Sequence, residues 1–485
     1  MKKSLLSGLF WVLLANLIVK PFWILGIEVG VQNAVGTEMY GFYFAIFNIT
    51  YIFNILLDVG VTNFNTRNIA QHPQLINKHL SGILGIKLLL LVLYLVVTFS
   101  VGALLGYSSR QFYLLAWLSF NQFLNSLILY LRSNFEGLLL FKWDSLFSVL
   151  DRLLMIVICG LLLWTDICGS SAFRIEWFVY AQTAAYLITA LLALFILSRR
   201  TRLRRLRFDK LFTLAILKKS LPFALLVLLM ASYNRIDPIL LQKLSPAANG
   251  NFQAGLYAEA FRLLDALTMI AYLVSVPLLP IYSKMVAQGP AHNAHAVADV
   301  TRMMFSLVVV FSVTAAVTFA TMSHELMALL WRNGHLADTA TVFSILIYGI
   351  IPISMTYIFG TLLTANGSLR TLNMLAAISL VINILINLLT IPRWGAAGSA
   401  WASLGAQSFM AISQMVVALR LFSMPVRTGY ILKLTAFALI VVAVNVLMPV
   451  SVWWIRLIIS AAVALTVAFA LRLINVNELI NIINE

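Results

Sequence analysis

The sequence predicts an all-α polytopic membrane protein with about fourteen transmembrane helices. We expect two pseudo-symmetric six-helix lobes and two extra C-terminal helices. Three observations predict this fold class. Hydrophobic residues make up 62% of the 485 residues and charged residues only 10%, unlike a soluble domain. Long apolar runs recur along the whole chain, and a pattern from its start returns in its second half.

The apolar runs are continuous rather than alternating, which is typical of helices and not of strands in a membrane barrel. Each is long enough to cross a hydrocarbon core of about 30 Å. The predicted spans are 8–30, 40–67, 79–106, 110–139, 144–165, 174–197, 215–243, 252–284, 298–322, 340–364, 369–391, 395–420, 428–447 and 451–473.

A basic segment separates the predicted lobes. The expected division is 1–197 for the N-terminal lobe, 198–214 for a basic cytoplasmic linker, 215–427 for the C-terminal lobe and 428–485 for the last two helices and a short tail. Most of the 33 Lys and Arg residues fall on the side of this linker, which predicts cytoplasmic termini in an inner membrane. Because the linker joins two membrane helices, we expect it to meet anionic lipid headgroups and not nucleic acid.

Short patterns recur at an offset of about 215 residues and indicate an internal duplication. Three pairs of segments carry it: Lys2-Lys3-Ser4-Leu5 with Lys218-Lys219-Ser220-Leu221, Lys20-Pro21 with Arg235-Ile236-Asp237-Pro238, and Gly41-Phe42-Tyr43 with Gly255-Leu256-Tyr257. Parallel repeats are typical of transporters with a substrate site between their halves. Pro21 and Pro238 should kink their helices and are candidate hinges.

Charged side chains inside the predicted spans indicate an internal polar surface, because an ionised group at bilayer depth is costly unless it is paired or hydrated. Sequence spacing suggests partners for several of them. Arg132 and Glu136 are four residues apart on one helix, and Asp58 and Lys87 lie at similar depth on consecutive helices. Asp151 and Arg152 are adjacent and are expected to point in different directions.

Other intramembrane charges cluster on the predicted span 252–284, which carries Gly255-Leu256-Tyr257 of the second copy of the repeat. Arg262 lies three residues from both Glu259 and Asp265, and Asp237 is at a similar depth one helix earlier. Lys20 and Arg235 have no obvious partner in the sequence and occupy nearly equivalent positions in the two repeats. They are the leading candidates for cations that face a central cavity, unless they are paired structural ions or reach the membrane edge.

The candidate substrate-binding cations are therefore Lys20, Arg235, Arg262 and Arg132. Candidate acidic groups, either coupling sites for H⁺ or Na⁺ or counter-ions, are Asp58, Asp237, Glu259 and Asp265. Candidate polar cavity residues are Asn383, Asn387, Tyr233 and Asn234; hydrogen bonding between helices is the alternative role for the two spaced asparagines. We expect no metal site, cofactor or catalytic residue, because Gly-rich phosphate loops, His-Glu-x-x-His and Gly-x-Ser-x-Gly are absent.

The chain resembles the polysaccharide transporter branch of the multidrug/oligosaccharidyl-lipid/polysaccharide (MOP) exporter superfamily, which contains the O-antigen-type lipid-linked oligosaccharide flippases. The resemblance spans the chain and rests on loose motifs. They are Gly41-Phe42-Tyr43, Asp58-Val59-Gly60, Thr66-Arg67-Asn68-Ile69-Ala70, Glu136-Gly137, Arg235-Ile236-Asp237, Gly255-Leu256-Tyr257, and Asn383-Ile384-Leu385-Ile386-Asn387-Leu388 before Gly395-Ala396-Ala397-Gly398-Ser399-Ala400.

The resemblance implies two lobes in a V around a cationic cavity and alternating access. The implied substrate is an undecaprenyl-pyrophosphate-linked O-antigen, capsule or exopolysaccharide repeat unit that moves from the inner to the outer leaflet. Membrane lipids, a coupling ion and the polysaccharide polymerase machinery are further candidate partners. A lipid II flippase is poorly separated by sequence, whereas a cation-coupled drug exporter is disfavoured because the first helix offers Lys20 and no carboxylate deep in the membrane. A membrane-embedded glycan ligase or polymerase would need larger outer loops.

Overall fold

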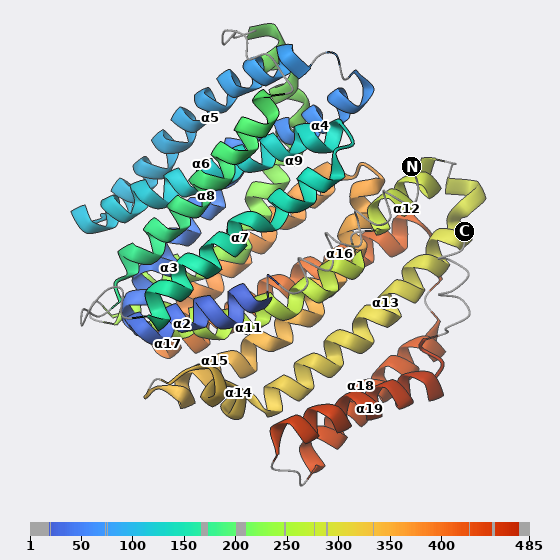
Figure 1. Cartoon of the computed structure of the whole chain (residues 1–485). Coiled ribbons are helices and arrows are strands. Elements are labelled where there is room, and N and C mark those ends of the chain that lie inside the picture. Colours follow the sequence, from blue (N-terminus) through green and yellow to red (C-terminus); the bar gives the residue numbers. More distant parts are fainter. Residues whose placement is uncertain are drawn as a thin grey trace. The chain divides into compact units, whose positions relative to one another are not determined.

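The computed structural model describes residues 19, 21–72, 74, 76–165, 173–199, 210–246, 249–275, 277–287, 290–332, 334–425, 427–448 and 452–474. These residues form helices and no strand, as Figure 1 shows, which confirms the all-α fold class. Within them, 11 helices are long and apolar enough to cross a membrane, or up to 12 if one bent pair counts as a single span. The chain is a multi-pass membrane protein.

The difference from about fourteen predicted spans has two causes. The helix α17 (Leu369–Leu421) is 53 residues long and contains two predicted spans. It turns at Gly395, whose φ of 52° and ψ of −129° are non-helical, three residues after Pro392. In addition, much of the first predicted span, including Lys20, lies outside the described residues.

The chain divides into two compact units, Met1–Lys243 with Ala247–Gly255, and Leu244–Pro246 with Leu256–Glu485. The predicted lobes, separated by the linker 198–214, follow the internal duplication of the sequence, and that division stays a prediction. Helices of the first unit are η1 (Trp23–Glu28), α2 (Val29–Val35), α3 (Thr37–Ile52), η2 (Phe53–Leu57), α4 (Val61–Gln71), α5 (Ile76–Leu104), α6 (Ser109–Gly137), α7 (Phe141–Trp164), α8 (Ile175–Ser198), α9 (Lys210–Arg235), α10 (Asp237–Leu244) and the first turns of α11 (Gly250–Ser275).

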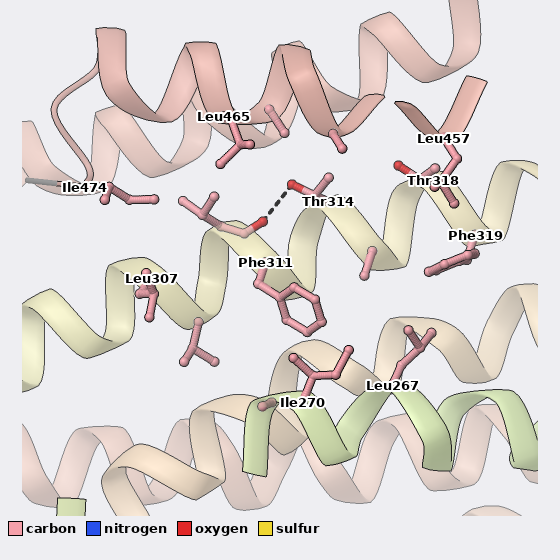
Figure 2. A pocket seen from close by; sticks show the side chains of 16 residues that line it. Leu267, Ile270, Leu307, Phe311, Thr314, Thr318, Phe319, Leu457, Leu465 and Ile474 are labelled. Atoms are coloured by element: carbon pink, nitrogen blue, oxygen red, sulfur yellow. Dashed lines mark hydrogen bonds between the residues drawn. The ribbon is translucent and has the colours of Figure 1, made fainter. Parts of the chain in front are cut away.

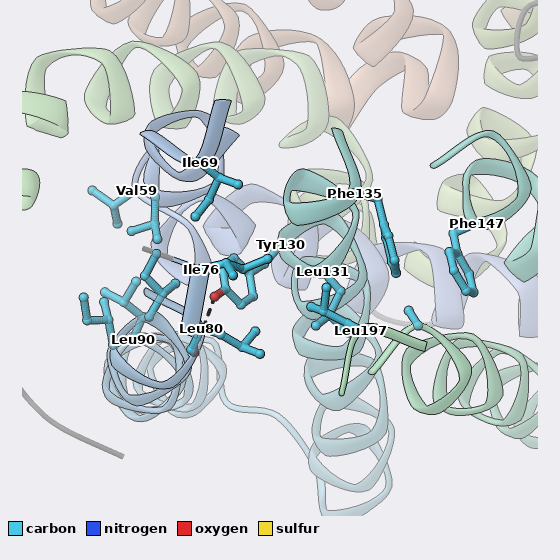
Figure 3. Close-up of a cluster of buried hydrophobic side chains, with 14 of the residues drawn as sticks. Val59, Ile69, Ile76, Leu80, Leu90, Tyr130, Leu131, Phe135, Phe147 and Leu197 are labelled. Atoms are coloured by element: carbon cyan, nitrogen blue, oxygen red, sulfur yellow. Dashed lines mark hydrogen bonds between the residues drawn. The ribbon is translucent and has the colours of Figure 1, made fainter. Parts of the chain in front are cut away.

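The first unit has a buried apolar core that joins α4, α5, α6 and α7. Figure 3 shows Ile69, Tyr130, Phe135 and Phe147 among its side chains. Gly137 at the end of α6 lets α4 approach closely, because a Cβ there would lie 2.8 Å from the Cβ of Ile69. This packing fixes the position of α4 after the break that precedes it.

The second unit comprises the rest of α11 and the helices α12 (Leu278–Ala287), α13 (Pro290–Thr321), α14 (Ser323–Leu330), α15 (Leu336–Leu346), η5 (Ile347–Gly349), α16 (Ile350–Ala365), α17, α18 (Thr428–Leu447) and α19 (Trp453–Ala470). The two last helices pack on α13 through a valine-rich core that includes Val313, Phe437 and Ala464. An apolar cavity of about 530 Å³ lies beside this core, lined from α11, α13 and α19 (Figure 2).

Candidate functional site

The first unit contains a broken helix between α3 and α4. The backbone tightens into the short η2 and then reverses through Val59, with φ of 42°, and Gly60, with φ of 78°. A positive φ is costly for a β-branched residue such as valine, so the surrounding contacts must hold the break in place. Asp58 lies just before α4, and its carboxylate accepts hydrogen bonds from the backbone N–H and the hydroxyl of Thr62 in the first turn of that helix.

Lys87 of α5 closes this break. Its Nζ lies 2.6 Å from Asp58 Oδ1, which confirms the predicted pairing, and it donates to Leu57 O at 3.0 Å and to Ser126 Oγ at 2.8 Å. The Lys87 side chain is only 1% exposed. An ammonium group has three donors, so it can satisfy the carboxylate and a carbonyl that the broken helix leaves without an intrahelical partner.

A second break separates α9 from α10, with a bend of 48°. Pro238 is the second residue of α10, where a missing N–H breaks no helical hydrogen bond, and the kink expected there is confirmed. Asp237 at the start of α10 is fully buried. On the other side of the bend, the guanidinium carbon of Arg235 lies 4.9 Å from the ring centroid of Tyr51.

The ring beneath Arg235 belongs to an aromatic row on α3. Tyr43, Phe47 and Tyr51 repeat every four residues, and their successive ring centroids are 5.8 and 6.0 Å apart. Tyr51 is 39% exposed, so the row ends at an open face. The sequence reasoning missed Tyr51, although the four-residue aromatic spacing on one helix could have revealed it.

The neighbours of Arg235 on α9 are held internally. The phenol of Tyr233 is buried, and the Asn234 side chain donates to Met230 O at 2.8 Å. At the far end of α10, Lys243 Nζ lies 5.3 Å from the centroid of the Tyr107 ring. Burial raises the pKa of Tyr107, which lies between two spans, so this ring is neutral at physiological pH.

The helix start after Pro21 carries a feature that the sequence reasoning did not find. The π-helix η1 begins two residues later and buries Glu28, which is 8% exposed and accepts from Trp23 Nε1 at 3.2 Å. Glu28, near the end of the predicted span 8–30, is therefore a carboxylate buried inside the protein. Burial in the protein is not depth in the membrane, so the expectation that the first helix has no carboxylate deep in the membrane stays a prediction.

An arginine completes this cluster from α7. The guanidinium of Arg152 lies 5.6 Å from the Trp23 ring centroid, and its Nε is 3.7 Å from Asp151 Oδ2. The two adjacent residues, expected to diverge, thus form a long ion pair. Arg152 also lies close enough to Glu28 to interact with it electrostatically.

Arg132 has a different partner from the one that the sequence spacing indicated. Its Nε lies 2.8 Å from Asp144 Oδ1, across the turn between α6 and α7. Glu136 instead accepts a hydrogen bond from the Thr66 hydroxyl of α4 at 3.2 Å. The i,i+4 pairing is wrong because neighbouring helices offer each side chain a nearer partner.

The second unit holds the remaining candidates on α11 and α17. Glu259 is 1% exposed and accepts from the Thr339 hydroxyl at 2.9 Å, while Arg262 is also buried and Asp265 is partly buried. Asn383 and Asn387 are fully buried, and the Asn387 amide donates to Asn383 Oδ1 at 2.9 Å. The two asparagines thus bond to each other along one helix, and the hydrogen bonds between helices that the alternative interpretation expected stay a prediction.

The repeated glycines meet in the first unit. A Cβ on Gly41 of α3 would lie 1.9 Å from Asn251 O and 2.4 Å from Gly255 N, and a Cβ on Gly255 would lie 2.0 Å from Thr37 O. Only glycine allows the backbones of α3 and α11 to cross this closely. The sequence motif therefore marks a helix crossing.

Comparison with known proteins agrees with this architecture. The family model described as "Polysaccharide biosynthesis protein" matches residues 5–286. No curated protein sequence matches the chain. Among solved structures, the lipid II flippase MurJ in an inward closed conformation aligns with a TM-score of 0.70 and 14% identity, over 95% of this chain and 99% of that chain.

Two further transporters share the fold. An inward-facing multidrug resistance MATE family transporter of the MOP superfamily aligns with a TM-score of 0.65 and 14% identity, over 82% of this chain and 94% of that one. A MOP superfamily transporter from Pyrococcus furiosus aligns with a TM-score of 0.56 and 14% identity, over 86% and 93%. Since the family model covers more than half of the sequence, this chain belongs to the polysaccharide biosynthesis protein family and has the fold of MOP superfamily transporters.

Proposed function

We propose that the protein is a flippase that moves an undecaprenyl-pyrophosphate-linked oligosaccharide from the inner to the outer leaflet of the cytoplasmic membrane by alternating access through a cationic cavity. The observation that carries this proposal is the joint likeness to a polysaccharide biosynthesis family and, over 95% of the chain, to the fold of a lipid II flippase. Both termini would lie in the cytoplasm.

Arg235 and Tyr51 support a binding subsite for the substrate head. A guanidinium binds phosphate oxygens through a planar pair of donors, and an exposed aromatic face packs against the apolar face of a sugar ring. The structure places the two groups together with the ring still 39% exposed. Lys20, Arg262 and Arg132 are the further proposed cations, while Asp58, Asp237, Glu259 and Asp265 are proposed counter-ions or coupling groups.

The apolar cavity between α11, α13 and α19 supports a place for part of the isoprenoid chain. Figure 2 shows Phe311, Leu267 and Leu465 facing it from three helices. The hydroxyl of Thr314 is turned back onto Val310 O at 2.6 Å, so it presents little polarity to the cavity. Burial of methylenes in such a space is favourable by about 0.8 kcal/mol for each CH₂.

The experiment is a flipping assay in proteoliposomes with an undecaprenyl-pyrophosphate-linked oligosaccharide, read out by enzymatic access to the glycan from one side. Wild type should expose the glycan, and Arg235→Ala should slow this at least about tenfold, the effect of losing about 1.4 kcal/mol of binding. Lys243→Ala is the matched control, since it also removes a cation from an aromatic ring, but from the largely buried Tyr107. Equal activity of empty and protein-containing vesicles would refute the proposal.

A cation-coupled drug exporter is the second candidate, and the Glu28 cluster is the observation that favours it. A buried carboxylate near Arg152 and Asp151 can bind a proton or a cation, and the fold is shared with a MATE transporter. If this function holds, Glu28→Gln should abolish resistance to cationic drugs in cells that express the protein, and glycan flipping should be absent from wild type.

A further inference from the structure

The second unit contains a cavity of about 350 Å³ that differs in chemistry from the apolar one beside α19. It is lined by α13, α16, α17, the turn before α18 and α18 itself. Its interior is apolar and includes three methionines, Met355, Met415 and Met424, whose flexible side chains adapt to irregular chains. Two arginines, Arg302 and Arg427, also line it, and the lining includes no carboxylate.

Within the described residues, the Arg302 guanidinium uses only part of its hydrogen-bonding capacity. One terminal nitrogen lies 3.5 Å from Pro425 O and the other lies 3.8 Å from Asp299, whose side chain is 74% exposed. Both distances are long for hydrogen bonds, and among the described residues the guanidinium makes no closer polar contact. A guanidinium has five donors in a fixed fork, so Arg302 retains the capacity for a bidentate bond to a phosphate.

The wall that carries these cations is preformed. The Tyr430 hydroxyl in the first turn of α18 is 2.7 Å from Ser306 Oγ, and Ser306 in turn donates to Arg302 O at 3.0 Å. These contacts fix α18 onto α13 beside the cavity. Arg427 precedes α18 as its N-cap, so its cation lies at the connection between α17 and α18.

We propose that this cavity binds an anionic glycerophospholipid, with the headgroup phosphate on Arg302 and Arg427 and one acyl chain among the methionines. The apolar interior excludes a free inorganic anion as the fitting ligand, and the cationic rim favours an acidic over a zwitterionic lipid. The Lys and Arg bias of the sequence predicts that this end of the bundle is cytoplasmic, where acidic headgroups are available. This site is independent of which substrate the protein moves.

Native mass spectrometry of the purified full chain tests the proposal, with phosphatidylglycerol and phosphatidylethanolamine of equal chain length supplied in equal amounts. Wild type should retain phosphatidylglycerol in preference. Arg302→Gln should reduce that preference about tenfold, the fold-change expected from one charge-assisted bond. Arg420→Gln is the matched control, because Arg420 is exposed in the last turn of α17, at the same end, and does not line the cavity.

A second variant and two competitors separate the alternatives. Met415→Trp fills the apolar part and leaves both arginines in place, so it should lower retention of either phospholipid. Glycerol 3-phosphate should not displace the lipid; displacement would reduce the site to an anion site and overturn the proposal. Displacement by undecaprenyl pyrophosphate that depends on Arg302 would assign the cavity to substrate and also overturn it, as would equal retention of the two phospholipids by wild type.

Discussion

The two helix breaks of the first unit place cations in opposite situations. At the break between α3 and α4, Lys87 is 1% exposed and bonds to Asp58, Leu57 O and Ser126. At the break between α9 and α10, Arg235 is only partly buried and lies over the exposed ring of Tyr51. The first cation satisfies polar groups at a break in a helix, and the second lies over an aromatic ring that is partly exposed.

This difference shows why an intramembrane cation does not by itself indicate a binding site. A buried ammonium whose three donors meet a carboxylate, a carbonyl and a hydroxyl has no donor left for a ligand. Its loss would expose both partners to an apolar interior and should affect folding. A cation on an exposed aromatic face adds little to stability and can still meet a substrate. Stability and transport should therefore respond differently at the two breaks.

The largest expected effect is at the closed break. Lys87→Met should lower the free energy of unfolding in detergent by about 3–5 kcal/mol, because Asp58 and Leu57 O lose a buried partner. Denaturant titration followed by circular dichroism measures it. Adding Asp58→Asn should recover part of the loss, since the amide oxygen can still accept from Thr62. A cost below about 1 kcal/mol for the single change would contradict a structural role.

The glycine crossing, which joins α3 to the start of α11 after the second break, should come next. Gly41→Ala forces a Cβ to within 1.9 Å of Asn251 O, and we expect a loss of about 1–3 kcal/mol as the helices separate. Gly85→Ala in α5 is the matched control, because nothing lies within 4 Å of its added Cβ. It should be neutral or stabilise by up to about 1 kcal/mol. Similar stabilities of the two variants would argue against the close crossing.

At the open break, Arg235→Ala should cost less stability than Lys87→Met, because Arg235 is only partly buried whereas Lys87 is 1% exposed. Transport should nevertheless fall by about tenfold or more. Arg235→Lys keeps the charge without the planar donors and should be intermediate. Thermal unfolding and the flipping assay on the same preparations check this pattern. A parallel fall in both quantities would show that the two breaks do not differ in kind.

The smallest expected effect concerns Arg132, which pairs with Asp144. The Arg132 side chain is 24% exposed and that of Asp144 is 18% exposed. Arg132→Gln should change the free energy of unfolding by about 0–1 kcal/mol, as is usual for such pairs near water. Asp144→Asn is its counterpart and should cost the same if the pair is all that Arg132 contributes. A transport defect in Arg132→Gln alone would instead support its proposed role among the substrate-binding cations.

Several local features could be predicted from the sequence because short-range rules govern them. Long apolar runs must become helices in lipid, where every backbone group needs an internal partner. Pro238 placed a kink correctly, since it lacks an N–H wherever it stands. The Asp58 and Lys87 pair was also predictable, because two charges at equal depth on consecutive helices have few other partners.

Tertiary structure alone decided which side chains meet across helices. The rotation of each helix and the angle at which it crosses its neighbours are not encoded in any four-residue pattern. For this reason Arg132 pairs with Asp144 and not with Glu136, Arg235 finds Tyr51, and the repeated Gly41 and Gly255 prove to be one contact. The sequence by itself determined the helices and the charges that they carry, and the packing of those helices decided which charges serve the fold and which face an open surface.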